Sequence, residues 1–229
     1  MAFLKAVLYS ILFCLALLLS SILINEVLGD TRIKIAVMDT GLNFKDKYFK
    51  PYLCSSGHRD FTNSSLIDNM NHGTPVAYLI TKKMNKDKYC LVIIKAYNTD
   101  FHGIKPFVDS LKYINDNNFK YVNISLTGPQ KDINEKTLIE ISKSKFFVAA
   151  GNDSKSYLES FPGGYNLDNV TVVGNWDCHS DKANKSSNFG DKVKFECGTD
   201  VLARTNKKTF KYMTGSSFSS PTLLAKELK

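Results

Sequence analysis

Short apolar runs alternate with segments of helical periodicity from about residue 31 onward. The apolar runs, most of them rich in Val, Ile, Phe and Tyr, are Ile33–Met38, Leu91–Tyr97, Lys120–Ile124, Phe146–Ala150 and Val170–Val173. Short runs rich in β-branched and aromatic residues are typical of buried strands. The pattern therefore predicts a sheet whose strands are separated by other elements.

Helical segments lie between and after these strands. Pro75–Ile80 is one, and Phe107, Leu111 and Ile114 recur at helical spacing after Pro106, which suits a first helical turn. Asp132 is expected to cap a further helix carrying Ile133, Leu138 and Ile141, and a last helical segment follows Ser217. Strands alternating with helices predict an α/β fold: a doubly wound, mostly parallel sheet with helices on both faces, as one domain over residues 30–229.

The N-terminus predicts export. A single cation, Lys5, precedes an apolar stretch without charges from Ala6 to Ile24. Such a stretch is typical of a signal peptide, here with a cleavage site near Gly29, but it is also long enough to cross a bilayer. Residues 1–29 are thus either a signal peptide or an N-terminal membrane anchor. Both alternatives place residues 30–229 outside the cytosol: secreted, periplasmic or tethered to the outer face of a membrane.

The cysteines agree with an exported chain. Four of the five lie beyond the apolar stretch, and an even number in an oxidising compartment predicts disulfides, with three possible pairings. Cys54–Cys90 and Cys178–Cys197 are favoured because neighbours in sequence pair more often. No C-x-x-C or C-x-x-H spacing occurs, so a zinc site is not expected.

The charge does not predict a nucleic-acid partner. The net charge is +8, but only three of the thirty basic residues are arginine. Nucleic-acid sites commonly use the planar, bidentate guanidinium, and the lysines here are scattered along the chain. A solvated basic surface is the better interpretation.

Polar residues follow three of the predicted strands, where an open parallel sheet places its functional crevice. Asp39-Thr40-Gly41 follows the first strand, Ser125–Gly128 follows the third, and Gly151-Asn152-Asp153 follows the fourth. These segments are expected to meet at one edge of the sheet.

Four residues supply the groups of a nucleophilic serine site. Such a site needs a nucleophile, a base, a group orienting the base, and donors for the oxyanion. Ser217 would be the nucleophile, His72 the base, Asp39 the orienting group and Asn152 an oxyanion donor. Each of these residues, taken alone, is more often a cap, a turn or a structural residue. Asp39-Thr40-Gly41 also matches the aspartic-protease tripeptide, which would require a homodimer because the motif occurs once.

Five blocks, in order, resemble the subtilisin family of serine proteases. They are Ile35–Gly41, His72–Ala77, Val122–Gly128, Val148–Asp153 and Gly215–Pro221. The family has the catalytic order Asp, His, Ser. The resemblance covers about residues 34–224 and implies a subtilisin-like serine peptidase domain in a short form without a propeptide.

The resemblance implies a role for each matched residue. Ser217 would be the nucleophile, His72 the base and Asp39 its orienting group, with Asn152 and the N–H of Ser217 as the oxyanion hole. Ser125, Leu126, Thr127 and Gly128 would offer a strand edge to an extended peptide, and Ser160 would floor the P1 pocket. The implied function is an exported, monomeric serine endopeptidase acting on peptide or protein substrates.

Departures from the family pattern leave a second function open. Pro75 and Tyr78 alter the histidine block, and Ser216, Phe218 and Ser219 alter the serine block, where polar residues would weaken packing. Residues 82–89 are too few for the loop that carries calcium in many relatives, so no cofactor or metal is indicated, and a structural calcium is the alternative left open. A catalytically silent module that binds peptides or a partner protein is the alternative.

Overall fold

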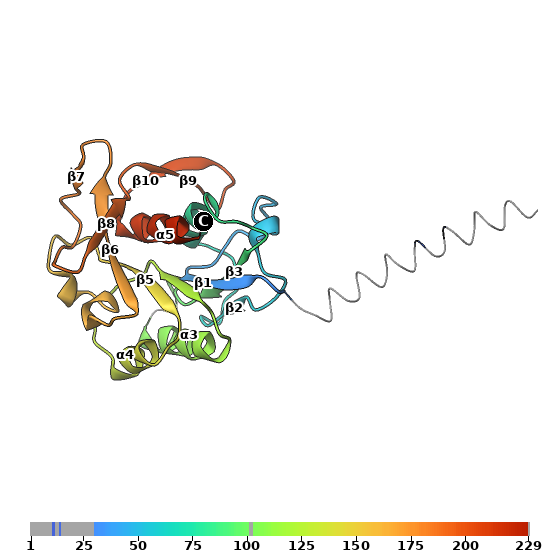
Figure 1. The fold of residues 1–229 in the computed structure, drawn as a ribbon, viewed down its shortest axis with the longest axis horizontal. Helices are drawn as coiled ribbons and strands as arrows, with labels where there is room; N and C mark the ends of the chain where they lie inside the picture. Colours follow the sequence, from blue (N-terminus) through green and yellow to red (C-terminus); the bar gives the residue numbers. More distant parts are fainter. Residues whose placement is uncertain (1–10, 12–13, 15–29, 101–102, 229) are drawn as a thin grey trace, which may run out of the picture. The chain divides into compact units, whose positions relative to one another are not determined.

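The computed structural model describes residues 11, 14, 30–100 and 103–228. Its contacts divide the chain into two compact units, residues 1–31 and 32–229. Most of the first unit lies outside the described residues, and the second unit contains the sheet and its helices (Figure 1).

The prediction of a transmembrane segment is corrected by the structure. Within the part of the chain that the structure describes, no helix has both the length and the apolar character needed to span a bilayer. Of the stretch 6–24 that carried the prediction, only Ile11 and Cys14 are among the described residues.

A mostly parallel sheet forms the centre of the second unit. Its strands run in the order β2-β3-β1-β4-β5-β6-β7, and β8 also pairs with β6. They are β1 (Ile33–Asp39), β2 (Arg59–Asp60), β3 (Tyr89–Lys95), β4 (Tyr121–Ile124), β5 (Lys145–Ala149), β6 (Val170–Asp177), β7 (Lys182–Ala183) and β8 (Lys194–Cys197). Only β6 and β7 pair antiparallel within this sheet of described residues. The five predicted strands are confirmed; β2 and β7 contain two residues each and have no apolar run to reveal them.

Helices cover both faces of this sheet. Alternate residues of β1 serve two separate cores, because successive side chains of a strand point to opposite faces. Ile35 and Val37 pack with α2 (Gly73–Thr81) and α5 (Ser216–Glu227). Figure 1 shows α5 above the sheet. Ala36 and Met38 pack on the other face with α3 (Ile104–Asp116) and α4 (Ile133–Glu140). The predicted α/β fold is thereby confirmed.

The apolar face predicted for α4 is wrong. Asp132 caps the helix as expected, since its Oδ1 accepts a hydrogen bond of 2.9 Å from the N–H of Glu135. Ile133 and Ile141, however, are 71% and 66% exposed. Glu135 and Ile139 are the buried residues of α4, so a carboxyl group occupies an inward-facing position.

Smaller elements complete the unit. β9 (Val201–Arg204) and β10 (Phe210–Met213) form a separate antiparallel hairpin. Three single-turn 3₁₀ helices, η1 (Lys50–Tyr52), η2 (Tyr157–Glu159) and η3 (Gly163–Tyr165), lie in the connections.

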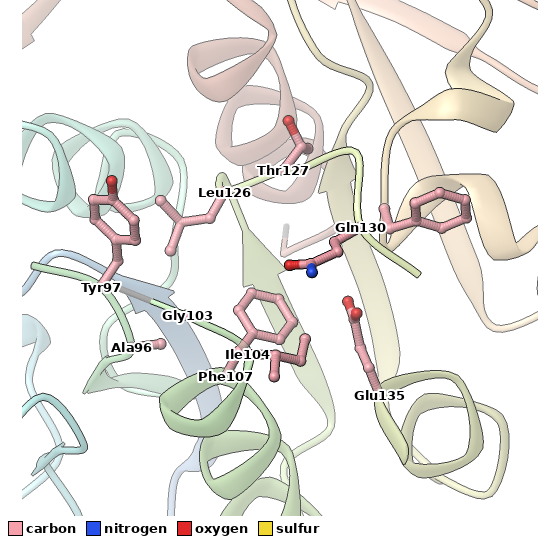
Figure 2. A pocket seen from close by; sticks show the side chains of 11 residues that line it. Ala96, Tyr97, Gly103, Ile104, Phe107, Leu126, Thr127, Gln130 and Glu135 are labelled. Carbon is pink, nitrogen blue, oxygen red and sulfur yellow. The ribbon is translucent and has the colours of Figure 1, made fainter. Parts of the chain in front are cut away.

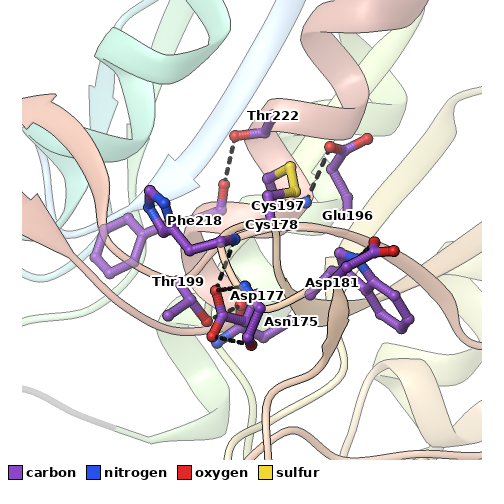
Figure 3. The surroundings of a disulfide bond; sticks show 12 residues. Asn175, Asp177, Cys178, Asp181, Glu196, Cys197, Thr199, Phe218 and Thr222 are labelled. Carbon is purple, nitrogen blue, oxygen red and sulfur yellow. Dashed lines mark hydrogen bonds between the residues drawn. A yellow bond between two sulfur atoms is a disulfide. The ribbon is translucent and has the colours of Figure 1, made fainter.

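Both predicted disulfides are confirmed. Cys54 is bonded to Cys90 on β3, and Cys178, just after β6, is bonded to Cys197 at the end of β8. Figure 3 shows the second bond beside the residues of α5. Each disulfide therefore fastens a connection to a strand of the sheet.

Removing either disulfide should destabilise the fold. The loops closed span 36 and 19 residues, for which loss of loop-closure entropy predicts costs of about 4 and about 3 kcal/mol. Urea unfolding of the two double variants, Cys54→Ala/Cys90→Ala and Cys178→Ala/Cys197→Ala, measures both costs. Unchanged unfolding free energies in both variants would contradict a structural role for the bonds.

Candidate active site

The structure brings Asp39 and His72 together at the carboxyl end of β1. Oδ1 of Asp39 accepts a hydrogen bond of 2.8 Å from Nδ1 of His72 and one of 2.7 Å from the N–H of Thr40. Asp39 is 1% exposed, whereas the His72 side chain is 26% exposed. Oδ2 of Asp39 is buried and has no hydrogen-bond partner among the described residues. The carboxylate thus keeps a proton on Nδ1 of the imidazole and orients the ring so that Nε2 faces outward.

Opposing effects act on the pKa of His72. Burial alone would lower that pKa, because it disfavours the charged imidazolium. The negative charge and hydrogen bond of Asp39, with a further contribution from the charge of Asp68, outweigh burial and raise the pKa above its usual 6.5. The site is therefore built to stabilise a protonated His72.

Asp68 organises the loop that carries His72, and no motif in the sequence predicted it. Its Oδ1 accepts hydrogen bonds from the Thr40 hydroxyl at 2.9 Å and from the N–H of His72 at 3.3 Å. Its Oδ2 accepts one of 2.8 Å from the N–H of Thr74. The only sequence signal is an acidic residue four positions before a histidine, which is also common in ordinary loops.

Gly73 permits the close approach of α2 to β1. A Cβ atom at this position would lie 2.3 Å from the carbonyl oxygen of Gly41 and 3.1 Å from Oδ1 of Asp39. The Gly73 N–H also donates to the Thr40 hydroxyl at 2.9 Å. Only glycine after His72 therefore allows the histidine and the aspartate to meet.

Ser217 lies in the first turn of α5 and is held by Ser125. Pro221 lacks an N–H, so the helix provides no donor for the carbonyl of Ser217, four residues earlier. The Ser125 hydroxyl supplies that bond at 2.8 Å. In return, the Ser217 hydroxyl donates to the carbonyl of Ser125 at 3.0 Å.

The buried serine side chains of this helix have hydrogen-bond partners. Ser220 is fully buried and its hydroxyl donates to Oδ1 of Asn123 at 2.9 Å. Nδ2 of Asn123 then donates to the Ser125 hydroxyl at 2.9 Å. Ser220, Asn123 and Ser125 therefore form a buried network between β4 and α5. The expected weakening at Ser216, Phe218 and Ser219 stays a prediction; the Ser219 hydroxyl donates to the Gly215 carbonyl at 3.5 Å.

Ser217 and His72 are near each other but not bonded. The His72 ring centroid lies 5.6 Å from that of Phe218, the residue after Ser217. Among the described residues, Nε2 of His72 has no hydrogen-bond partner, and the Ser217 hydroxyl is directed to Ser125. The structure thus assembles the acid and the imidazole, with the serine hydroxyl turned to another acceptor.

Asn152 faces the start of α5. Its Oδ1 accepts a hydrogen bond of 2.9 Å from the N–H of Ser216, which fixes the amide so that Nδ2 is the remaining donor. Because α5 begins at Ser216, the N–H of Ser217 has no acceptor in a preceding helical turn. Nδ2 of Asn152 and the N–H of Ser217 are therefore two donors near the start of α5.

The predicted peptide-binding strand is open over part of its length. Leu126 and Thr127 make no backbone hydrogen bonds among the described residues, whereas Gly128 exchanges two with Phe161, at 3.0 and 2.7 Å. Leu126, Thr127 and Gly128 line a cavity of about 160 Å³ with Tyr97 and Phe107 (Figure 2). Ser125 does not line it.

Ser160 also lies outside this cavity. It is 3% exposed, and a Cβ atom on Gly151 would come within 2.9 Å of its hydroxyl. Ser160 is therefore placed beneath the turn that carries Asn152.

The connection between α2 and β3 does not fit a calcium ion. Residues 82–88 contain four lysines and one aspartate, a charge that repels a cation. The oxygens of Asn85 already accept hydrogen bonds from Asp87, Lys88 and Tyr89 within the turn. Calcium requires six to eight oxygen ligands, which this turn does not offer.

Comparisons with known proteins agree with the geometry. A model described as the subtilase family matches residues 30–223. A thermophilic serine proteinase of Bacillus sp. (strain AK1) is 25% identical over 212 residues, covering 84% of this chain and 50% of that protein. The chain thus spans half the length of that relative. Subtilisin DY of Bacillus licheniformis is 25% identical over 205 residues, covering 82% and 73%.

Solved structures share the fold. A cold-adapted subtilisin-like serine proteinase has a TM-score of 0.72 at 23% identity, covering 84% of this chain and 72% of that one. The nisin leader peptidase NisP of Lactococcus lactis has a TM-score of 0.72 at 17% identity, covering 86% and 76%. The expected subtilisin-like fold is confirmed.

Ser125 and Pro221 should be energetically coupled. Ser125→Ala leaves the Ser217 carbonyl without a donor and should lower the free energy of unfolding by about 1–3 kcal/mol. In a Pro221→Ala background the new N–H can donate to that carbonyl, so the same substitution should cost about 1 kcal/mol less. Urea unfolding of the wild type, both single variants and the double variant measures the coupling. Equal costs in the two backgrounds would contradict this exchange of donors.

Asp68→Asn should disturb both the loop and the imidazole. The substitution places an NH₂ group against backbone N–H donors, so the free energy of unfolding should fall by about 1–3 kcal/mol. Removal of the charge should lower the pKa of His72, measured by NMR titration of the ring with His72→Gln for assignment. Asp116→Asn, on an exposed position of α3, is the control. An unchanged His72 pKa in Asp68→Asn would rule out the charge effect of Asp68, and an unchanged free energy of unfolding would rule out its positioning role.

Proposed function

Because the chain belongs to the subtilase family of serine endopeptidases, we propose that it is an exported enzyme that hydrolyses peptide bonds through Asp39, His72 and Ser217. The 2.8 Å bond between Asp39 and His72 is the observation that carries the proposal. It places an oriented imidazole with a raised pKa near the start of the helix that bears Ser217.

The first chemical step transfers a proton from Ser217 to His72. Rotation about the Cα–Cβ bond of Ser217 releases its hydroxyl from the Ser125 carbonyl and directs it to Nε2 of His72. The serine oxygen attacks the substrate carbonyl carbon as Nε2 takes the proton. Asp39 stabilises the imidazolium that results.

Asn152 stabilises the charge that develops on the substrate oxygen. Its Nδ2 and the N–H of Ser217 donate to the oxyanion of the tetrahedral intermediate. The intermediate collapses when His72 gives its proton to the leaving amine, which leaves an acyl group on Ser217. Water, deprotonated by His72, then attacks the acyl group and restores the serine hydroxyl.

An extended peptide lies beside Leu126 and Thr127. Their free backbone N–H and C=O groups allow strand addition, which orders the peptide without regard to its side chains. The backbone N–H and C=O of Gly128 are already bonded to Phe161, so the peptide pairs with fewer residues than the predicted segment 125–128. Ser160, beneath the Asn152 turn, closes the floor of the P1 pocket.

Other features support export and a monomeric state as parts of the proposal. The two disulfides require an oxidising compartment for their formation, in keeping with the N-terminal apolar stretch as an export signal. A monomer suffices because one chain supplies all the groups of the site. The reaction as written uses no metal or cofactor.

One observation favours the alternative of a catalytically silent, peptide-binding module. The Ser217 hydroxyl donates to Ser125 rather than to His72. The aspartic-protease alternative is abandoned, because Asp39 binds an imidazole and the family is a different one.

A fluorophosphonate probe separates the enzyme from the silent module. Labelling of Ser217 is expected in the wild type and its loss in Ser217→Ala, by mass spectrometry. The labelling rate should fall as the pH drops through the raised pKa of His72, because the base must be neutral. In Asn152→Ala, kcat on a peptide should drop about 100- to 1,000-fold, the range found in a subtilisin on loss of such a donor. A folded wild type that is not labelled would reject the enzyme.

A further inference from the structure

The cavity beside Leu126 and Thr127 contains one acidic group among apolar walls. Ile104 and Phe107 from the start of α3, Leu126, and Phe161 provide the walls. Figure 2 shows the carboxyl group of Glu135 pointing from α4 into the cavity, toward the side chain of Gln130. The cavity thus combines an apolar path with a polar end.

Glu135 is buried without a cation. Its side chain is 3% exposed, and its one hydrogen bond to a described residue is from the Tyr165 hydroxyl to Oε2 at 2.8 Å. No lysine or arginine in the described part of the chain forms an ion pair with it. A buried carboxyl group is costly unless it is paired or protonated, so a cation bound in the cavity would stabilise the charged form of Glu135 on α4.

We propose that Glu135 selects a lysine or arginine side chain of the peptide substrate in this cavity. The inference rests on the proposed peptidase function and adds a specificity-determining residue to it. A basic side chain has a long apolar stem, which matches Leu126, Phe107 and Phe161, and a cationic head, which matches the carboxylate. An apolar side chain of equal length would fill the cavity but leave the carboxyl group unpaired.

The surroundings of Glu135 allow its charge to appear when the cation arrives. Burial raises its pKa to about 7, the Tyr165 hydrogen bond opposes this effect, and the charge of Asp132 adds to it. Among the described residues, the titratable groups that act on it are Tyr165 on η3 and Asp132 at the start of α4. Near neutral pH the free enzyme therefore holds Glu135 partly protonated, and a bound ammonium or guanidinium group displaces that proton.

The selected residue is not the one that precedes the cleaved bond. Ser217 is tied to Ser125, whereas the cavity begins at Leu126 and extends toward Gly128. Along an extended peptide, whose residues rise about 3.3 Å each, the cavity therefore receives a side chain further from the cleaved bond.

Quenched peptides carrying one lysine, or norleucine in its place, at each position before the cleaved bond test the proposal. At one position beyond the first, the wild type should show a kcat/KM for lysine about tenfold above that for norleucine. Glu135→Gln keeps the size and the Tyr165 contact but removes the charge, so the ratio should fall to about 1 or below. Glu140→Gln, exposed on the same helix, is the matched control and should keep the wild-type ratio.

The pH dependence gives a second measurement that needs no variant. In the wild type the lysine-to-norleucine ratio should rise as the pH increases through about 7, because Glu135 becomes charged. Titration of His72 affects both peptides alike and cancels in the ratio. A wild type that is labelled at Ser217 and cleaves both peptides equally at every position would overturn the selection while leaving the peptidase intact. Absence of labelling would instead reject the proposed function itself.

Discussion

The hydrogen bond between Asp39 and His72 depends on a close approach between a strand end and a helix start. It forms because β1 delivers a carboxylate to the edge of the sheet and because Gly73 lets α2 come within contact of Gly41. Asp68 then ties the intervening loop to Thr40 and to the first turn of α2. The position of the His72 imidazole thus depends on a glycine, a buried acid and the buried carboxyl end of β1.

The second part of the site is fastened by an exchange of hydrogen bonds. Pro221 deprives Ser217 of a helical donor, and Ser125 replaces it from the end of β4. Asn123 and Ser220 continue the same network into the core, so every member of it has a partner. The sheet therefore positions both the imidazole and the serine through side chains at strand ends, and the helices contribute the first turn of each.

Much of this arrangement was predictable from local signals. Buried strands appear as apolar runs, and the ends of β1, β4 and β5 directed attention to Asp39, Ser125 and Asn152. Asp68 was not predictable, because its role consists of hydrogen bonds to residues brought near only by folding. The face of α4 was mispredicted since periodicity assigns apolar residues to the core, whereas here Glu135 turns inward and Ile133 turns outward. The acceptor of the Ser217 hydroxyl was likewise set by tertiary contacts that no pattern reveals.

Because the Ser217 hydroxyl donates to the Ser125 carbonyl, its reactivity would depend on the fraction of molecules in which the Ser217 side chain adopts another rotamer. In the proposed mechanism, a molecule in which this bond is intact does not pass a proton to His72, so the expected rate is the intrinsic rate multiplied by the rotated fraction. A peptide that competes for the Ser125 carbonyl would enlarge the rotated fraction. Under the proposed mechanism, occupancy of the strand edge at Leu126 and Thr127 would thereby be coupled to activation of the nucleophile.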